Sequence, residues 1–246
     1  MKKIKSIRDV DNEYLDQNFY KKPKQIHLEA KKLIFKSLSG KENQQLKLVD
    51  FGSADGQLIY QLNNQNKYDI KLEGVEPIKK LVQKARKNIK GVKFRVGSVL
   101  DKSLYKKSSI DIAVSTGVFS IFKDHKKYIG NMLHWVKPNG IILIQSIFNN
   151  DDYDVSVDYK KSTQNDFNKS NSKTGWNIFS KKTISLFLKS RKINNFKFID
   201  FNLKVNVKYN KDKAYKSWTK KLKNDKLISI NGLSLILDQK FLLIRR

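Results

Sequence analysis

The sequence predicts an α/β fold, in which short buried strands alternate with amphipathic helices. An apolar run at Leu46, Leu48 and Val49 is typical of a buried strand, and a glycine-bearing turn and a helical pattern follow it. The same alternation continues to about residue 147. The length of 246 residues suffices for one α/β domain with a substantial core or for two small ones, and no linker divides the chain.

Composition excludes several classes of protein. The chain has no cysteine, which rules out disulfides and thiolate metal sites. Its three histidines, His27, His125 and His134, are scattered, so we expect no metal site. No apolar run approaches the roughly 20 residues that span a bilayer, and the basic start lacks the apolar core of a secretory signal. We therefore expect a cytoplasmic protein without a membrane span.

The net charge of +28 permits two interpretations. Only six of the 51 basic residues are arginine, the residue that forks onto phosphate and reads guanine edges, and the lysines are spread along the whole chain. A lysine-rich surface that reflects composition alone is one interpretation. The other is an electrostatic footprint for RNA, anionic glycan carriers or nucleotide-linked substrates.

Residues 12–40 contain the first predicted helix. Apolar residues recur at helical spacing from Ile26 to Leu38, and Gly40 closes the helix. The plainer interpretation is a helix that covers the sheet. The alternative is that the segment before it, from Phe19 to Lys22, folds over a bound ligand.

The stretch 46–57, LKLVDFGSADGQ, is the strongest functional signal. A glycine turn between a strand and a helix lets a ligand approach the main chain and aims free N–H groups at it. The spacing is acid-x-Gly-x-x-x-Gly (Asp50, Gly52, Gly56), not the G-x-G-x-x-G of dinucleotide sites. Because Asp50 would repel a phosphate, the turn favours a ligand with a cationic amino-acid end.

The next predicted strand, residues 71–75, ends in Glu76 and Pro77. Glu76 lies 24 positions after Gly52, where an acid at a strand's carboxyl end can accept both hydroxyls of a ribose. The alternative is an exposed loop acid. A helix is predicted from Pro77 to Gly91, followed by a strand at 92–96 and the corner Gly97-Ser98-Val99-Leu100-Asp101.

Two further strands complete this half of the chain. Residues 110–116 form an apolar strand that ends in the small polar corner Ser115-Thr116-Gly117. Asp124 is expected to cap a helix that runs to Trp135. A turn at Lys137-Pro138-Asn139-Gly140 then leads into a strand at 141–147.

Four features of the sequence, in their order and spacing, resemble the class I S-adenosylmethionine-dependent methyltransferases. They are the glycine turn at 46–57, the acid Glu76, the strand at 110–116 with its polar corner, and the turn at 137–140 before an apolar strand. The resemblance covers residues 25–147 well and 180–246 loosely. It implies a doubly wound, mostly parallel seven-stranded sheet of Rossmann-like type, with an inserted cap after strand five. It also implies S-adenosylmethionine as the cofactor, a molecule that carries an ammonium and a sulfonium and no phosphate.

The resemblance assigns a set of cofactor-binding positions. Two of them depart from the family pattern: Ala54 replaces a middle glycine, and Ser98 replaces the acid that often bonds the adenine amino group. At that corner Ser98, Asp101 or main-chain groups at Val99 remain as alternatives. The implied cofactor residues are Asp50, Gly52, Ser53, Ala54, Gly56, Glu76, Pro77, Ser98, Val99, Thr116 and Gly117.

Residues 148–178 are mostly polar, contain scattered aromatic residues and show little hydrophobic periodicity, so we expect a long functional loop there. Family members place substrate-specific insertions at this point. Aromatic rings stack on the C–H faces of sugars and carboxylates accept from hydroxyls, so this composition suits a sugar-like substrate. The expected walls of the acceptor site are Asp152, Tyr153, Tyr159 and Trp176.

The remaining elements are a helix from Ser180, strands at 196–201, 203–207 and 240–245, and an added hairpin around 227–233 with Tyr215 and Trp218 beneath it. The last strand is expected to be antiparallel. We expect one methyltransferase domain over 1–246, with a covering segment at 1–40, a cofactor core at 44–147 and substrate-side insertions at 148–178 and 206–236.

His125 is a candidate general base, because many small-molecule O-methyltransferases use a histidine and its pKa lies near working pH. The alternative is an exposed histidine in the first turn of a helix. His134 is expected to pack with Trp135 at the end of that helix.

The predicted activity is O-methylation of a sugar or nucleotide-activated glycan building block, with a small-molecule acceptor. The region 149–233 resembles methyltransferases found with surface-polysaccharide genes. Ser115-Thr116-Gly117-Val118 stands where amino-methylating enzymes of nucleic acids carry Asn/Asp-Pro-Pro-Tyr/Phe, which argues against that reaction. The alternatives are an RNA methyltransferase that uses its basic surface and a cofactor-binding protein without turnover.

Overall fold

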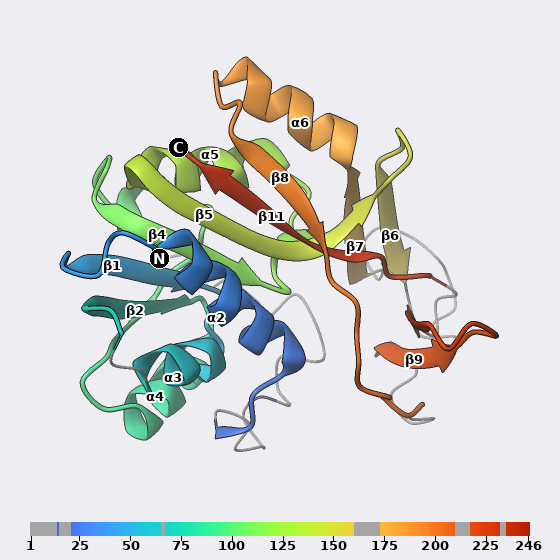
Figure 1. Ribbon diagram of the computed structural model, residues 1–246, viewed down its shortest axis with the longest axis horizontal. Helices are drawn as coiled ribbons and strands as arrows, with labels where there is room; N and C mark the ends of the chain where they lie inside the picture. Colours follow the sequence, from blue (N-terminus) through green and yellow to red (C-terminus); the bar gives the residue numbers. More distant parts are fainter. Residues whose placement is uncertain (1–13, 15–20, 65–66, 160–172, 210–216, 232–234) are drawn as a thin grey trace.

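The computed structural model describes residue 14 and residues 21–64, 67–159, 173–209, 217–231 and 235–246 (Figure 1). Tyr215 lies outside these residues, and so do Phe19 and Tyr20 of the predicted segment from Phe19 to Lys22. None of the helices in the described parts of the chain is long and apolar enough to cross a bilayer.

Seven strands lie side by side in the central sheet, in the order β3-β2-β1-β4-β5-β11-β8, and two further strands join the sheet through β5. Neighbours pair in parallel from β3 to β5, whereas β11 runs antiparallel to both β5 and β8. This arrangement confirms the predicted doubly wound sheet and its antiparallel last strand. The strands are β1 (Leu46–Phe51), β2 (Ile70–Glu76), β3 (Lys93–Val96), β4 (Ile110–Thr116), β5 (Val136–Asn149), β8 (Phe196–Asp200) and β11 (Gln239–Arg245).

Helices cover both faces of the sheet, which explains why the central strands are apolar on both sides. On one face α2 (Gln25–Ser37), α3 (Gln57–Asn63) and α4 (Lys79–Asn88) pack into one core. On the other face α5 (His125–Trp135) and α6 (Lys181–Ser190) pack into a second core around Phe51 and Trp135, whose rings stack with centroids 5.0 Å apart.

Local signals placed the helix starts correctly. The Asp124 carboxylate accepts from the Lys127 N–H at 2.8 Å, which confirms it as the N-cap of α5. The Ser180 hydroxyl accepts from the Thr183 N–H at 2.9 Å and caps α6 in the same way. Short 3-10 turns, η3 (Lys102–Leu104) and η4 (Phe119–Ile121), follow β3 and β4.

The predicted turn at residues 137–140 is wrong, because these residues belong to β5. The pairing of β5 with β4 shifts register here, and Asn139 has a φ of +62°. The Asn139 N–H donates to the Arg246 carbonyl at 2.7 Å, and the Arg246 N–H donates to Gly140. The end of the chain therefore provides the pairing that draws this segment into the strand.

The long loop expected at 148–178 is also wrong in part. Its described residues contain β6 (Val155–Tyr159) and β7 (Lys173–Ser180), which pair antiparallel. The end of β7 pairs in parallel with the end of β5, at Phe148 opposite Phe179. Because most of β6 is exposed or half-exposed, the segment carries the polar composition that suggested a loop.

The strand expected at 203–207 does not form. Instead, Val207 bonds with Thr219 of β9 (Ser217–Lys221), through its N–H at 2.8 Å and its carbonyl at 2.9 Å. β9 pairs antiparallel with β10 (Leu227–Asn231). The hairpin predicted around 227–233 is therefore displaced, because residues 227–231 form its second strand and Trp218 belongs to its first strand instead of lying beneath it. This two-stranded sheet is separate from the central one.

Candidate cofactor site

The turn after β1 has the backbone geometry that its glycines predict. Gly52 and Gly56 have φ values of +82° and +90°, in the left-handed region that favours glycine. A side chain on Gly56 would also come within 2.5 Å of the buried Ile89, and one on Gly52 would collide with Val118. Both positions therefore require glycine for backbone and for space.

Ala54 also has a positive φ, +47°. An alanine in this region is strained by roughly 1–2 kcal/mol, which is the cost of the departure from glycine noted in the sequence. The turn nevertheless forms, because the Gly52 and Ser53 N–H groups both donate to the Val75 carbonyl of β2, at 2.8 and 3.1 Å.

Asp50 lies at the end of β1 with only 2% of its surface exposed. Within the described structure its Oδ1 atom has no hydrogen-bond partner. Burial, and secondarily the charge of Glu76, raise the pKa of Asp50 to about 8. A buried carboxyl in this state favours a cationic partner, which would hold it ionised.

Glu76 braces the turn from the neighbouring strand. Its Oε2 atom accepts from the Ala54 N–H at 3.1 Å, and its Oε1 atom accepts from the Ile78 N–H at 3.0 Å. It is buried, which contradicts the alternative of an exposed loop acid. These two bonds hold the carboxylate at the carboxyl end of β2, beside the glycine turn.

Asp55 is a third buried acid of the turn, which the sequence analysis did not single out. It is fully buried, its carboxylate lies 4.0 Å from the Lys84 ammonium, and burial raises its pKa. Its place inside the glycine turn was the available signal. The turn thus has three buried carboxyl groups around it: Asp50, Asp55 and Glu76.

The corner after β3 lies beside Glu76, since the Gly97 N–H donates to the Glu76 carbonyl at 3.1 Å. The Ser98 hydroxyl accepts from the Leu100 N–H at 3.2 Å, and Val99 is buried. Asp101 is exposed and accepts from the backbone N–H and hydroxyl of Ser103. Its carboxylate is thereby engaged in capping η3.

The β4 corner completes the carboxyl edge of the sheet. The Gly117 N–H donates to the Gln145 carbonyl at 3.1 Å, and Val118 packs over Gly52. Gln145 is buried in β5, and its side-chain oxygen has no partner within the described residues. The sequence analysis missed Gln145; the signal was an amide in the middle of an apolar strand.

Comparison with known proteins identifies the family. Residues 42–194 match the family model described as a methyltransferase domain.

The chain belongs to this methyltransferase family. The resemblance seen in the sequence is thereby confirmed, and the enzyme is an S-adenosylmethionine-dependent methyltransferase of Rossmann-like fold. No curated protein matches the sequence.

Solved structures agree on the fold. A chain of the Haloferax volcanii complex between the Trm112 activator and a methyltransferase has a TM-score of 0.60 at 12% identity, over 98% of this chain and 99% of that one. A methyltransferase of Thermotoga maritima has a TM-score of 0.53 at 15% identity, and the match covers 96% of both chains. The Burkholderia thailandensis 1,6-didemethyltoxoflavin-N1-methyltransferase, solved with S-adenosylhomocysteine, has a TM-score of 0.55 at 12% identity. The match covers 96% of this chain and 84% of that one.

The turn is compatible with this cofactor. A buried carboxyl oxygen without a partner, flanked by glycines and by two further acids, suits a ligand that bears an ammonium and no phosphate. The assignments to individual residues remain predictions.

In the methyltransferase, His125 is the first residue of α5. Its ring packs against Phe179 and Phe187, with centroids 4.8 and 5.8 Å away, in a groove between α5 and α6. Burial lowers the pKa of His125, with a smaller opposing effect from Asp154, so the imidazole is neutral at pH 7.

The four predicted acceptor-site residues lie in two neighbouring segments. Asp152 and Tyr153 are exposed in the loop before β6, and Asp152 pairs with Lys182 of α6 at 2.5 Å. Tyr159 and Trp176 lie on the β6–β7 hairpin, where Trp176 packs on the cluster of Ile147, Ile178 and Leu237.

The β6–β7 hairpin is tied to the segment that follows the β4 corner. The Asn177 amide donates to the Ser120 carbonyl of η4 at 3.1 Å and accepts from the Ser156 hydroxyl at 3.0 Å. Lys123 pairs with Asp158 at 3.5 Å. The hairpin therefore stands next to the segment that follows the carboxyl end of β4, and its substrate-side role remains a prediction.

Proposed function

We propose that the enzyme methylates a hydroxyl oxygen of a sugar or of a nucleotide-activated glycan building block. The buried, unpartnered oxygen of Asp50 beside the glycine turn carries the cofactor part of this proposal. The position of the β6–β7 hairpin beside η4 supports the acceptor part.

Each group at the turn has a role in holding the cofactor, which supplies a methyl group activated by a sulfonium charge. Asp50 would pair with the ammonium end, and Gly52, Ser53, Ala54 and Gly56 would let the main chain approach. The remaining contacts are to ribose from Glu76 and Pro77, to adenine from Ser98 and Val99, and to the methyl side from Thr116 and Gly117.

The acceptor side supplies position more than acid–base chemistry. Methyl transfer needs little help beyond loss of the acceptor's proton, so alignment and exclusion of water account for most of the rate. The rings of Tyr159 and Trp176 would stack on C–H faces of a sugar, and Asp152 and Tyr153 would reach hydroxyls from the loop before β6. The amides of Gln145 and Asn177 add polar groups nearby.

The cofactor role of Asp50 is tested by Asp50→Asn, with Asp111→Asn as the control. We expect the first change to weaken S-adenosylmethionine binding by roughly tenfold or more, the effect of losing a charged hydrogen bond. Asp111 lies near the start of β4, far from its carboxyl end, and its carboxylate pairs with Lys137 at 2.9 Å. Asp111→Asn should therefore leave the affinity for S-adenosylmethionine unchanged. Equal calorimetric dissociation constants for wild type and Asp50→Asn would refute the assignment.

The acceptor is tested with S-adenosylmethionine that carries a labelled methyl group. We expect label in a nucleotide-sugar pool and not in total RNA. Label in RNA would replace the glycan proposal by an RNA methyltransferase. Tight cofactor binding without label in either pool would favour a cofactor-binding protein without turnover.

The general-base role of His125 is tested separately with His125→Gln. The proposal expects a loss of turnover with unchanged cofactor affinity. Intact turnover would assign this ring to packing against Phe179 and Phe187 alone.

A further inference from the structure

A small surface unit surrounds the β9–β10 hairpin, beyond the end of the central sheet (Figure 1). We call it the hairpin patch and define it as the described residues of 204–236. The segment before β9 joins the unit through the two hydrogen bonds between Val207 and Thr219. Ile236 joins it through a bridge to Ile230 of β10.

The hairpin patch exposes an unusual amount of apolar surface. Among the described residues, ten large apolar side chains are exposed, and half of them belong to this unit. Ile236 is 67% exposed, and Tyr209, 54% exposed, packs its ring on half-buried Trp218 at 4.7 Å. Clustered exposure of this kind marks an interaction surface, whereas single exposed apolar residues do not. The five residues are Val205, Val207, Tyr209, Leu222 and Ile236.

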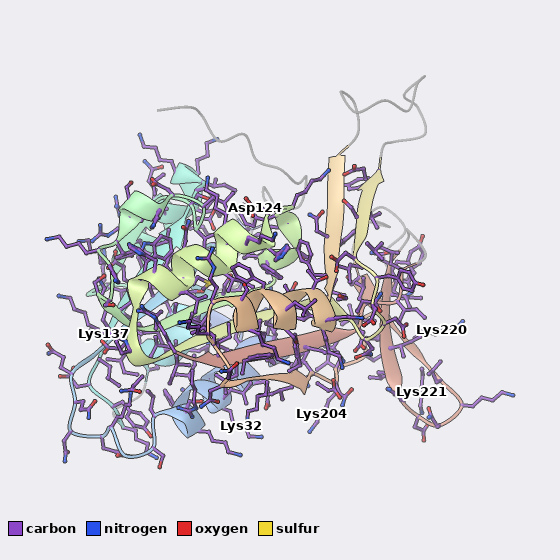
Figure 2. All side chains as sticks on the ribbon, turned by 90° about the horizontal axis from the view of Figure 1, so that it is seen from above. Lys32, Asp124, Lys137, Lys204, Lys220 and Lys221 are labelled. Carbon is purple, nitrogen blue, oxygen red and sulfur yellow. The ribbon has the colours of Figure 1, made fainter. Side chains whose placement is uncertain are left out.

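The same unit is strongly basic. Residues 204–236 contain nine lysines, two aspartates and no arginine. Within the described part, six lysines are exposed, and Asp225 pairs with Lys221 at 2.6 Å. Figure 2 shows Lys220 and Lys221 at the opposite end of the molecule from Lys137. The six are Lys204, Lys208, Lys220, Lys221, Lys223 and Lys226.

We propose that the hairpin patch docks the enzyme on an anionic lipid bilayer. Aliphatic side chains enter the headgroup boundary, tryptophan and tyrosine settle at the interface, and lysine ammoniums attract anionic lipids. The hairpin patch carries all three groups within one small unit. Charge complementarity to an anionic membrane and the absence of acidic residues other than Asp212 and Asp225 in 204–236 select this partner.

RNA fits the patch less well. Single-stranded nucleic acid is held by aromatic faces on which bases stack and by arginine. Here aliphatic residues outnumber aromatic ones, arginine is absent, and Tyr209 and Trp218 already pack edge to face on one another. The patch therefore resembles a bilayer-binding surface more than a base-stacking platform.

Docking in this way would place the substrate-side insertion near the membrane. Leu235 of the hairpin patch belongs to the same apolar cluster as Ile178 and Trp176 of β7. The β6–β7 hairpin and the hairpin patch are thus in contact through one apolar cluster. The inference does not depend on which acceptor is methylated, so a failed methylation assay would leave it standing.

The electrostatic part is tested by flotation of the full chain with phosphatidylcholine vesicles, with or without phosphatidylglycerol. We expect binding to the anionic vesicles only, weakening as salt is added. Lys220→Glu/Lys223→Glu should weaken it by about tenfold or more. The control, Lys106→Glu/Lys107→Glu, makes the same charge change at another exposed lysine pair, before β4, and should alter binding by less than about twofold.

The apolar part is tested by fluorescence. Brominated phosphatidylglycerol acyl chains should quench emission of the wild type, and Trp218→Phe should lose most of this quenching, because Trp135 is fully buried in the core and Trp176 packs on the cluster of Ile147, Ile178 and Leu237. Leu222→Ser/Ile236→Ser should weaken vesicle binding, whereas Leu186→Ser, at an exposed position on α6, should not. Unchanged affinity for S-adenosylmethionine verifies that each variant is folded.

Three results would overturn the proposal. The first is no binding of the wild type to phosphatidylglycerol vesicles at low salt. The second is an equal loss of vesicle binding in Lys220→Glu/Lys223→Glu and Lys106→Glu/Lys107→Glu, or vesicle binding without quenching by brominated lipid. Either result indicates adsorption by net charge alone. The third is tight binding of single-stranded RNA that needs Lys220 and Lys223, without vesicle binding, which would assign the patch to nucleic acid.

Discussion

The glycine turn and the β6–β7 hairpin both lie at the carboxyl edge of the sheet, yet different forces hold them in place. The turn is fixed by backbone angles, by missing side chains at Gly52 and Gly56, and by buried carboxyls. The hairpin is fixed by a few side-chain contacts to η4 and by two residues of pairing with β5. From this difference we expect the glycine turn to tolerate little change and the β6–β7 hairpin to tolerate more.

The strongest effect expected at the turn is a dependence of stability on pH. Because burial raises the pKa of Asp50 to about 8 from an unfolded value near 4, the ligand-free protein loses stability as pH rises from about 4 to 8. Asp50→Asn removes this loss and should raise unfolding free energy at pH 8, relative to pH 5, by up to about 4 kcal/mol. Thermal melts of both proteins at the two pH values measure it; parallel melting profiles would contradict it.

Gly56→Ala should lower stability by about 3 kcal/mol, since a left-handed φ and a close contact with Ile89 both act against it. Gly130→Ala provides the control. Gly130 lies in α5, where a side chain would remain 4.0 Å from Phe187, and alanine should stabilise the helix by about 0.5–1 kcal/mol. Denaturant unfolding measures both changes, and equal effects would show that the turn does not require its glycine.

The hairpin is expected to respond differently. Asn177→Ala removes the hydrogen bond to η4 and should lower kcat/KM for the acceptor by about fivefold, with cofactor affinity unchanged, because about 1 kcal/mol of positioning is lost. Ser156→Ala leaves that bond intact and should have little effect. A matching fall in cofactor affinity would mean that the two regions are not independent.

The smallest expected effect is at Ala54. Ala54→Gly relieves the strain of a φ of +47° but adds freedom to the unfolded chain, so the net change should be below about 1 kcal/mol, in favour of glycine. Unfolding in urea would measure it. A loss of more than about 1 kcal/mol would show that the methyl group makes contacts that outweigh its backbone cost.

The sequence by itself determined the central sheet, the glycine turn and the caps of α5 and α6. These depend on neighbours in the chain: an apolar run, a glycine where φ is positive, or an aspartate three residues before the N–H that it accepts from. The role of Glu76 was predicted only in part, since its bonds to Ala54 and Ile78 arise where two strands meet.

Only the tertiary structure decided the features that involve distant partners. Residues 137–140 became strand because Arg246 pairs with them, and the expected strand at 203–207 instead bonds to Thr219. Gln145 and Asp55 stand out only because the folded chain buries their polar side chains. The ring of His125 lies between α5 and α6 because it packs against Phe179 and Phe187. Local patterns carry no information on such partners, because the contacts exist only once the chain has folded.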